Sequence, residues 1–412
     1  MQRWLYFVKY LRDFGWQPVV YTPQNPDFDL RDESLLAEVP AGIEVVKRPI
    51  WEPYSLYNRL SGKKSGRQQG VVRQPRSWLG RLALWIRANL LVPDPRIFWV
   101  RPSVAFLSRY IRQQQVDALV TSGPPHSMHL IGRELHRRLH LPWLADFRDP
   151  WSEWDVNDWL QMGQSARKSQ RKLELGVLTE ADLVTTVSPT LCEALTRLGG
   201  KRVVTINNGF DLELPQDNTT PDKFRLAHVG LINRYYNPEK LWQVLDERCA
   251  REPEFADRLE IHLAGTVEQA VLNSLNRLPI LKDKVVYHGY LSHEQVKNLY
   301  EQSFVLLLPI RDNDNGRWIL PGKMYEYLAY GRPILAIGPV QSDASDLLRQ
   351  VGHQPCLAYD DEQGLAGFID RAWQDYRQGT PRMERAAIMP YHRRNLTGKL
   401  AGYLDSLLRT NQ

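Results

Sequence analysis

The chain of 412 residues contains only three cysteines, Cys192, Cys249 and Cys356, which lie far apart in the sequence. An odd and scattered set excludes a disulfide framework and has no metal-ligand spacing, so it favours a reducing, cytoplasmic compartment. No apolar run is long enough to span a bilayer. The first ten residues are amphipathic and lack the small-residue cleavage site of a signal peptide.

Apolar residues make up 43% of the chain and charged residues 24%, which excludes a disordered polymer. Lys and Arg exceed Asp and Glu by 53 to 47. This excess is modest and shows no concentrated basic tract, so we expect no nucleic-acid partner. A basic balance also suits a protein that handles phosphates or lies on an anionic membrane face.

Short β-branched runs that end in Gly, Pro or Asp alternate with helical stretches throughout the chain. This alternation predicts parallel sheets, and two successive series predict an α/β fold of two Rossmann-like domains. We place the domains at residues 1–206 and 207–390, followed by a C-terminal helix in 391–412 that packs back on the first domain. The predicted strands are 18–22, 43–48, 118–121, 143–147, 183–187, 203–206, 224–229, 259–264, 284–288, 304–308 and 333–337.

The N-terminal domain begins inside a helical pattern, which Gly15 ends as a C-cap, and it reaches its first predicted strand at Pro18. A Rossmann-like domain normally opens with a strand and a Gly-rich turn before its first helix. Two explanations remain: the natural N-terminus lies upstream of Met1, or this domain lacks its first strand.

Polar side chains follow two strands of the N-terminal domain, where ligands of doubly wound domains bind. A Gly-Pro-Pro loop leads to His126 and His129, which we interpret as a pocket rim. A capped loop with a solvent-exposed histidine fits the same pattern. The next strand leads into Arg148 and Asp149, which either face a substrate or form a structural ion pair.

The sharpest pattern in the C-terminal half is the stretch 321–336. Pro321 and Gly322 precede a helix that starts at Lys323, so backbone N–H groups and an ammonium meet at one helix N-terminus. That combination suits a diphosphate. Glu326, one turn further on, can accept two hydroxyl hydrogen bonds. An amphipathic helix with one solvated Glu explains the same residue pattern.

A second basic pair, Arg234 and Lys240, follows the strand end at Gly230 and suits a pyrophosphate, although two exposed cations fit equally well. The triplet Asp312-Asn313-Asp314 has the form of a metal-binding motif. Short acidic triplets are common in polar loops, and no other cluster has metal spacing, so we predict no metal site.

One helix face carries aromatic and aliphatic residues beside arginines. The pattern suits a helix that lies on a membrane surface, and an ordinary buried helix fits it equally well. The apolar residues include Trp78, Leu82, Trp85 and Ile86, and the flanking arginines are Arg76, Arg81 and Arg87.

The order and spacing of several segments make the chain similar to a known family. It resembles the family-four retaining glycosyltransferases of the GT-B fold, of the bacterial type that builds surface polysaccharides. The resemblance covers nearly the whole chain and rests on SGPPHSMH (122–129), ADFRDPW (145–151), ADLVTTVSPTL (181–191), INNGFD (206–211), HVG (228–230), VVYHGYLSHEQV (285–296) and PGKMYEYLAYGRPILA (321–336).

The resemblance implies two domains that face each other across a cleft, with a nucleotide-sugar in the C-terminal domain and an acceptor in the N-terminal one. It implies that Gly322 and Lys323 lie at the diphosphate and Glu326 at the ribose. The remaining implied donor-site residues are Gly230, Arg234, Lys240 and Pro321. The implied catalytic residues, on the acceptor and sugar side, are Asp149, Arg148, His126 and His129.

The implied activity is transfer of a sugar from a UDP- or GDP-sugar, with retention and without a metal, to a glycan acceptor that is lipid-linked. The implied location is peripheral, at the inner face of the cytoplasmic membrane. This chain has Trp318 where many members carry a second Glu, and the Gly-rich loop is absent. Other GT-B classes, an epimerase or a phosphorylase, remain open, as does a non-catalytic truncated partner subunit that keeps the donor pocket.

Overall fold

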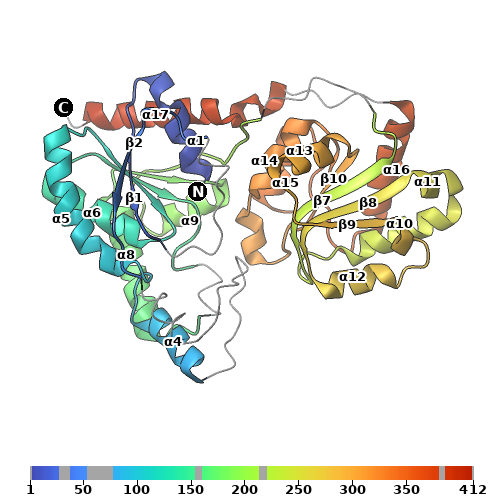
Figure 1. The fold of residues 1–412 in the computed structure, drawn as a ribbon, viewed down its shortest axis with the longest axis horizontal. Coiled ribbons are helices and arrows are strands. Elements are labelled where there is room, and N and C mark those ends of the chain that lie inside the picture. The colour runs from blue at the N-terminus through green and yellow to red at the C-terminus, as the bar shows by residue number, and fades with distance from the viewer. Residues whose placement is uncertain are drawn as a thin grey trace. The chain divides into compact units, whose positions relative to one another are not determined.

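The computed structural model describes residues 2–26, 38–52, 78–153, 160–212, 220–379 and 386–410. The chain divides into two compact units, Met1–Asn207 with Arg393–Gln412, and Asn208–His392. Each unit is built on parallel strands with helices around them, which confirms the α/β class (Figure 1). We predicted domain limits after residues 206 and 390, while the units divide after 207 and 392.

All eleven predicted strands are present in the structure, with ends shifted by at most three residues. Their β-branched and aliphatic runs are the feature that made them predictable. The strands are β1 (Val19–Pro23), β2 (Glu44–Arg48), β3 (Leu119–Gly123), β4 (Trp143–Phe147), β5 (Leu183–Thr186), β6 (Val203–Thr205), β7 (Phe224–Ile232), β8 (Leu259–Val267), β9 (Val285–Gly289), β10 (Val305–Pro309) and β11 (Ile334–Ile337).

Helix ends follow local side-chain signals. Ser188 and Ser292 accept hydrogen bonds from backbone N–H groups in the first turns of their helices, and Gly331 ends another helix in a left-handed conformation. The helices of the first unit are α1 (Gln2–Leu11), η1 (Arg12–Phe14), α4 (Trp78–Asn89), α5 (Ile97–Gln114), α6 (Ser127–Leu139), α8 (Gln164–Glu180), α9 (Pro189–Arg197) and α17 (Arg393–Thr410).

The helices of the second unit are α10 (Glu239–Arg251), α11 (Pro253–Arg258), α12 (Gln269–Asn276), η2 (Leu281–Lys284), α13 (His293–Glu301), η3 (Asp314–Trp318), α14 (Gly322–Tyr330), α15 (Asp343–Gln350), α16 (Glu362–Gln378) and η4 (Ala386–Tyr391). None of the helices in the described part of the chain is long and apolar enough to cross a bilayer. Of the predicted site and helix residues, Arg76 lies outside the described residues.

The described strands of the first unit form two separate parallel sheets, β1-β2 and β3-β4-β5-β6. The first described element is the helix α1, as the sequence predicted. Helices α1 and α17 pack on one face of β3–β6, and α8 and α9 pack on the other.

Asp146 ties α1 to the strand ends of the first unit. Its carboxylate is fully buried and accepts hydrogen bonds from the guanidinium of Arg3, at 3.1 and 3.3 Å, and from Trp4 Nε1 at 2.7 Å. Ser122 and Thr185 each donate at 2.9 Å. Burial alone would raise the pKa of Asp146, but Arg3 and the other donors hold its pKa below the usual value.

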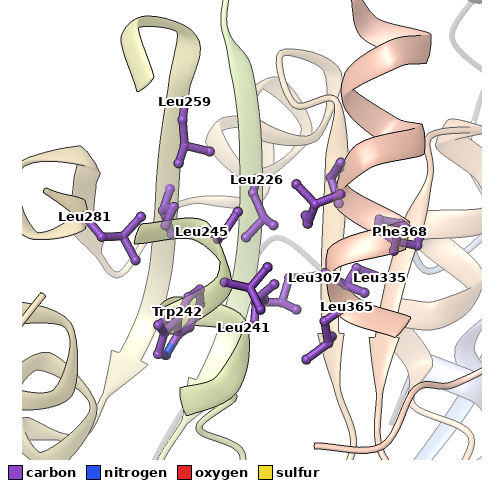
Figure 2. Packing of buried hydrophobic residues seen from close by; sticks show 14 of the residues in the cluster. Leu226, Leu241, Trp242, Leu245, Leu259, Leu281, Leu307, Leu335, Leu365 and Phe368 are labelled. Atoms are coloured by element: carbon purple, nitrogen blue, oxygen red, sulfur yellow. The ribbon is translucent and has the colours of Figure 1, made fainter. Parts of the chain in front are cut away.

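The second unit has one five-stranded parallel sheet in the order β11-β10-β7-β8-β9. Strands β7 and β10 are direct neighbours, so their carboxyl ends lie side by side. A hydrophobic core forms between β7, β8, β10 and β11 on one side and α10 and α16 on the other (Figure 2). A second core packs α13, α14 and α15 on the opposite face of the sheet. These two layers fix the start of α14 beside the ends of β7 and β10.

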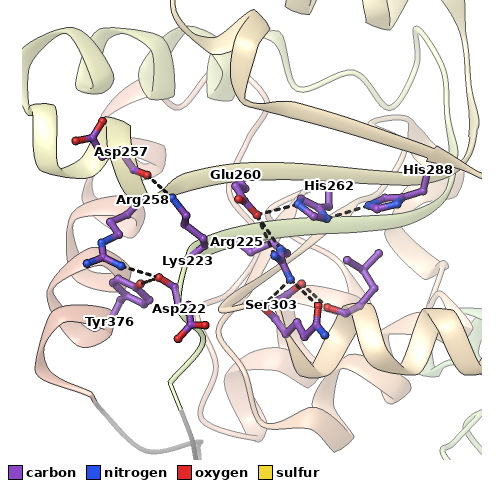
Figure 3. Close-up of polar contacts among 12 residues, drawn as sticks. Asp222, Lys223, Arg225, Asp257, Arg258, Glu260, His262, His288, Ser303 and Tyr376 are labelled. Carbon is purple, nitrogen blue, oxygen red and sulfur yellow. Dashed lines mark hydrogen bonds and ion pairs between the residues drawn. The ribbon is translucent and has the colours of Figure 1, made fainter.

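A polar network crosses β7, β8 and β9 (Figure 3). Arg225 donates to Glu260 at 2.9 and 3.2 Å, Glu260 lies 3.1 Å from His262 Nε2, and His262 Nδ1 lies 2.9 Å from His288 Nε2. Burial and the Arg225 charge lower the pKa of His262 to about 4. The ring is therefore neutral near pH 7, and the network links three strands without an added buried cation.

The contact between Arg3 and Asp146 yields a stability prediction. Arg3→Met leaves the buried carboxylate without its cation, so the free energy of unfolding of the first unit should fall by about 3 kcal/mol. Arg138→Met removes a cation from an exposed pair with Glu134 and should cost under about 1 kcal/mol. Denaturant unfolding of both variants checks this, and equal losses would contradict a special role for Arg3.

Candidate functional site

The densest cluster of predicted site residues in the second unit lies where β7 ends and α14 begins. Lys323 is in the first turn of α14, and its ammonium lies against Gly230, the seventh residue of β7. A Cβ placed on Gly230 would overlap Lys323 Nζ and would lie 3.2 Å from its Cε. Gly230 also has φ +136°, which L side chains rarely adopt. Only glycine therefore leaves room for this ammonium.

The ammonium of Lys323 is poorly compensated. Burial lowers the pKa of Lys323, and the nearby charge of Glu326 acts in the opposite direction. Among the described residues, no carboxylate forms an ion pair with Lys323 within 4 Å, and the side chain is half-buried. A cation held in that way is stabilised by an anion that enters the site.

His228 adds a polar atom beside Gly230 and Lys323. It belongs to the HVG segment, and no site role was predicted for it. Its ring is buried, and its Nδ1 lies 3.1 Å from the carbonyl oxygen of Leu307. Nε2 has no hydrogen-bond partner among the described residues and lies 3.8 Å from a Cβ built on Gly230. Burial and then the charge of Lys323 lower the pKa of His228 to about 4, so this ring is neutral near pH 7.

The start of α14 is open around its first residues. Pro321 is the N-cap and offers no side-chain hydrogen bond. Gly322 is exposed, and a Cβ built there meets no atom within 4 Å. The N–H of Met324 donates to the carbonyl of Pro321 at 2.9 Å. The N–H groups of Gly322 and Lys323 come before it at the open end of the helix, where a negatively charged group is favoured. Glu326 follows one turn later and is half-buried.

The structure does not bring Arg234 and Lys240 into contact with Lys323. Arg234 donates from Nη2 to the hydroxyl of Tyr235 at 2.7 Å and stacks on its ring. Arg311, just beyond β10, stacks on the same ring at 5.0 Å. Lys240 Nζ lies 3.1 Å from Glu362 at the start of α16. That ion pair is largely exposed and contributes little to the stability of the fold, so an anion that enters the site can compete for the ammonium.

In the first unit, His126 and His129 are buried rather than solvent-exposed. His129 stacks on Phe147 and has Nδ1 2.9 Å from Thr121 Oγ1, while His126 stacks on Trp151. Both nitrogens of His126, and Nε2 of His129, have no partner among the described residues. Burial lowers the pKa of His129 to about 3 and that of His126 far below its usual value. Both rings are neutral and can accept or donate a hydrogen bond.

Gly123 lies directly against these two rings. A Cβ built on Gly123 would be 2.6 Å from His129 Nε2 and 3.0 Å from His126 Nδ1. Arg148 holds the loop that follows, because its Nε donates to the carbonyl of Gly123 at 3.2 Å and its Nη2 donates to that of Pro124. The structure thus brings His126, His129 and Arg148 together around one loop.

Asp149 follows Arg148 and is half-buried. Burial raises the pKa of Asp149, and the charge of Arg148 opposes that change. Ser127, the first residue of α6, donates from its N–H and from its Oγ to the carboxylate of Asp94, both at 2.8 Å. Asn313, in the middle of the acidic triplet, accepts a hydrogen bond from the N–H of Gly316 and caps η3.

Two family models match the chain. The model described as "Glycosyl transferase 4-like domain" matches residues 2–209, and the one described as "Glycosyl transferases group 1" matches residues 223–375. A search of curated protein sequences found no match.

Solved structures with the same fold include three glycosyltransferases of low sequence identity. Sucrose-phosphate synthase from Thermosynechococcus elongatus has a TM-score of 0.60 at 15% identity, over 98% of this chain and 92% of that one. An α,α-trehalose-phosphate synthase (UDP-forming) from Burkholderia vietnamiensis has a TM-score of 0.58 at 12% identity, over 95% and 99%. Anabaena HepE in complex with UDP-glucose has a TM-score of 0.53 at 14% identity, over 99% and 93%. This chain therefore has the GT-B fold.

The contact between Gly230 and Lys323 predicts a coupling between the two positions. Gly230→Ala should lower the free energy of unfolding by several kcal/mol, because the new methyl group meets the ammonium and the backbone is strained. Gly289→Ala is the matched control, since it has φ +65° at another strand end but open space around it. It should cost only about 1 kcal/mol.

A double-mutant cycle separates the clash from the strain. Gly230→Ala combined with Lys323→Ala should recover part of the stability lost in Gly230→Ala alone, as measured by thermal and denaturant unfolding. Strict additivity of the two substitutions would show that the ammonium does not lie against Gly230.

Proposed function

We propose that this chain, which belongs to the glycosyl transferase 4-like family, moves a sugar from a nucleoside-diphosphate sugar to a glycan acceptor. The family models and the GT-B fold support the transferase class. The observation that carries the proposal is the half-buried ammonium of Lys323, which lies against Gly230 and has no carboxylate partner among the described residues.

Cleavage of a nucleotide-sugar leaves a diphosphate with growing negative charge. Lys323 and the open N–H groups at Gly322 are placed to stabilise that charge in the proposed complex. Because these donors are fixed before the donor arrives, they need little reorganisation during the reaction. The complex of HepE with UDP-glucose, on the same fold, supports a UDP-sugar as one donor class, and a GDP-sugar is the other.

Glu326 is one turn from Lys323 and is our candidate for the ribose hydroxyls, because a carboxylate can accept two hydrogen bonds. Arg234 and Lys240 belong to the outer part of the proposed donor site. Both cations make weak, exposed contacts. Either one can therefore move to bind a second phosphate without a large loss of stability.

We place the acceptor and the sugar in the first unit, beside the loop held by Arg148. His126 and His129 are neutral near pH 7, which suits hydrogen bonds to sugar hydroxyls better than donation of a proton by an imidazolium. Asp149 is the proposed acidic group of this region. Retention of anomeric configuration through attack on the same face as the leaving diphosphate needs no glycosidase-like pair of carboxylates, and we propose that no metal takes part.

The proposed acceptor is a lipid-linked glycan at the inner face of the cytoplasmic membrane, in the assembly of a bacterial surface polysaccharide. Two exposed tryptophans, Trp78 and Trp85, lie on α4 together with Arg81 and Arg87, and contact of this helix with the membrane would bring the enzyme to such an acceptor.

One observation favours a second candidate function. Trp318 stands where the family resemblance places a second Glu, so this chain could hold a nucleotide-sugar without transferring the sugar. A partner subunit of that kind would bind donor and give no product, and an epimerase would convert the nucleotide-sugar without any acceptor.

Nucleotide binding tests the donor site. Lys323→Met should weaken the binding of UDP or GDP by roughly tenfold to a hundredfold, because it removes a charge-assisted hydrogen bond. The same substitution should raise the melting temperature, since an unpaired half-buried charge is gone. Isothermal titration and thermal unfolding measure both effects. Lys282→Met, an exposed lysine of the same unit, is the control, and unchanged affinity in Lys323→Met would exclude the proposed site.

Product analysis tests the reaction. With nucleotide-sugar and lipid-linked glycan, we expect release of nucleoside diphosphate, a new glycosidic bond of the donor's anomeric configuration by NMR, and no effect of a metal chelator. Without acceptor, the nucleotide-sugar should stay unchanged. An inverted product would overturn retention, conversion without acceptor would indicate an epimerase, and binding without turnover would favour the partner subunit.

A further inference from the structure

We infer that the first unit carries a composite site for anionic lipid, in which an apolar stripe on α4 enters the bilayer surface and a lysine pocket at the start of α8 takes the phosphate headgroup. The inference deepens the proposed function and rests on it only for the role of the membrane as the place of the acceptor. The stripe consists of Trp78, Leu82, Trp85 and Ile86 on α4 and of Leu90 directly after it, which are 65%, 46%, 51%, 37% and 63% exposed.

The stripe occupies one side of its helix. Its members follow one another at steps of four, three, one and four residues, which is the period of a single helical face. The opposite side packs inward through Gly80 and Ala88. Arg81 and Arg87 lie at the two borders of the stripe, by the same period. A soluble surface rarely exposes so many large apolar side chains together, so this face is an interaction site.

The charge of the first unit identifies the occupant. This unit contains 33 Lys and Arg against 21 Asp and Glu, while the second unit contains 20 against 26. From Arg59 to Arg87 the sequence has eight Lys and Arg and no Asp or Glu, so the expectation of no concentrated basic tract is wrong for this stretch. Basic residues that precede an amphipathic helix in the sequence, as here, are typical of binding to anionic lipid.

The lysine pocket lies next to the end of the stripe. Asn89, the last residue of α4, accepts a hydrogen bond from the N–H of Gly163 at 2.7 Å, and this contact joins α4 to the residue before α8. In Figure 1, α4 lies at one end of the first unit, beside the start of α8. The pocket has a volume of about 510 Å³ and is lined by Gln164, Ser165, Lys168, Ser169 and Lys172.

The pocket lining suits a phosphate headgroup. Lys168 and Lys172 are one turn apart on the same face of α8, and neither forms an ion pair with another described residue. Ser165 and Ser169 supply hydroxyl donors between them. Two cations and two hydroxyls in an open pocket bind a phosphodiester, and the adjacent apolar stripe selects one that is attached to acyl chains.

Other occupants fit the stripe less well. A second copy of the chain would bring two sets of the described cations together, and like charges at an interface oppose association. These cations are Arg81, Arg87, Lys168 and Lys172. A nucleic acid would satisfy the cations but would leave the tryptophans and leucines in water, which the hydrophobic effect opposes. An anionic bilayer accommodates both features.

Vesicle sedimentation tests the inference without any sugar substrate. The full chain should bind vesicles of phosphatidylcholine mixed with phosphatidylglycerol, bind phosphatidylcholine alone weakly, and dissociate as salt is raised. Lys168→Gln/Lys172→Gln should reduce binding to the mixed vesicles roughly fivefold per lysine and leave the weak binding to phosphatidylcholine. Lys282→Gln/Lys284→Gln, in the second unit, is the matched control and should bind as the unaltered chain does.

The stripe is tested separately. Trp78→Ser/Trp85→Ser should lose binding to both vesicle types, while Tyr287→Ser/Tyr290→Ser, which alters exposed aromatics of the second unit, should lose none. Normal binding by the tryptophan variant, or equal binding of both vesicle types by the unaltered chain, would overturn the inference. The inference would also be overturned if light scattering showed that the unaltered chain is a dimer and the tryptophan variant a monomer.

Transfer to a short water-soluble glycan distinguishes this inference from the proposed function. The vesicle-binding variants should keep that activity, because none of their substitutions lies in the donor or acceptor site. If the unaltered chain binds vesicles but transfers no sugar, the proposed function alone is refuted. If it transfers sugar but does not bind vesicles, the lipid site alone is refuted.

Discussion

The contact between the Lys323 ammonium and Gly230 is the constraint on which the functional interpretation depends. It requires a strand end without a side chain, a helix that begins at that strand end, and a sheet that holds both in place. The two hydrophobic layers of the second unit supply that support. A charge that is partly removed from water and has no carboxylate in contact is unfavourable in the empty protein, and it becomes favourable when an anion binds.

The buried charge of the first unit, in contrast, is fully compensated by its neighbours. Asp146 is surrounded by donors from α1, β3 and β5, so no acceptor capacity is left for a ligand. Its role is to hold the first helix and three strands in register. The unsatisfied buried atoms of this unit include those of the imidazoles beside Gly123, one strand residue further on. Asp146 is therefore a structural polar group whose hydrogen bonds are satisfied, whereas the buried imidazoles have atoms that a ligand can bind.

The strands and most helix ends could be predicted from the sequence, because periodicity, serine caps and C-terminal glycines are local signals. Side-chain partners could not. Lys240 pairs with Glu362, 122 positions away, and Arg3 reaches Asp146, 143 positions away. The burial of His126 and His129 depends on stacking against Phe147 and Trp151, which no spacing shows. His228 stood in a quoted motif, yet only the fold turns its ring toward Gly230. For each of these side chains, the partner and the degree of burial depend on tertiary contacts between distant parts of the sequence.

The division of the first unit into two sheets has a consequence for handling the protein. In the described part of the chain, β1 pairs only with β2, and β3 pairs only with β4. Each of these strands thus presents one row of backbone amides and carbonyls that no neighbouring strand satisfies. Such open edges template the addition of further strands, including those of other molecules.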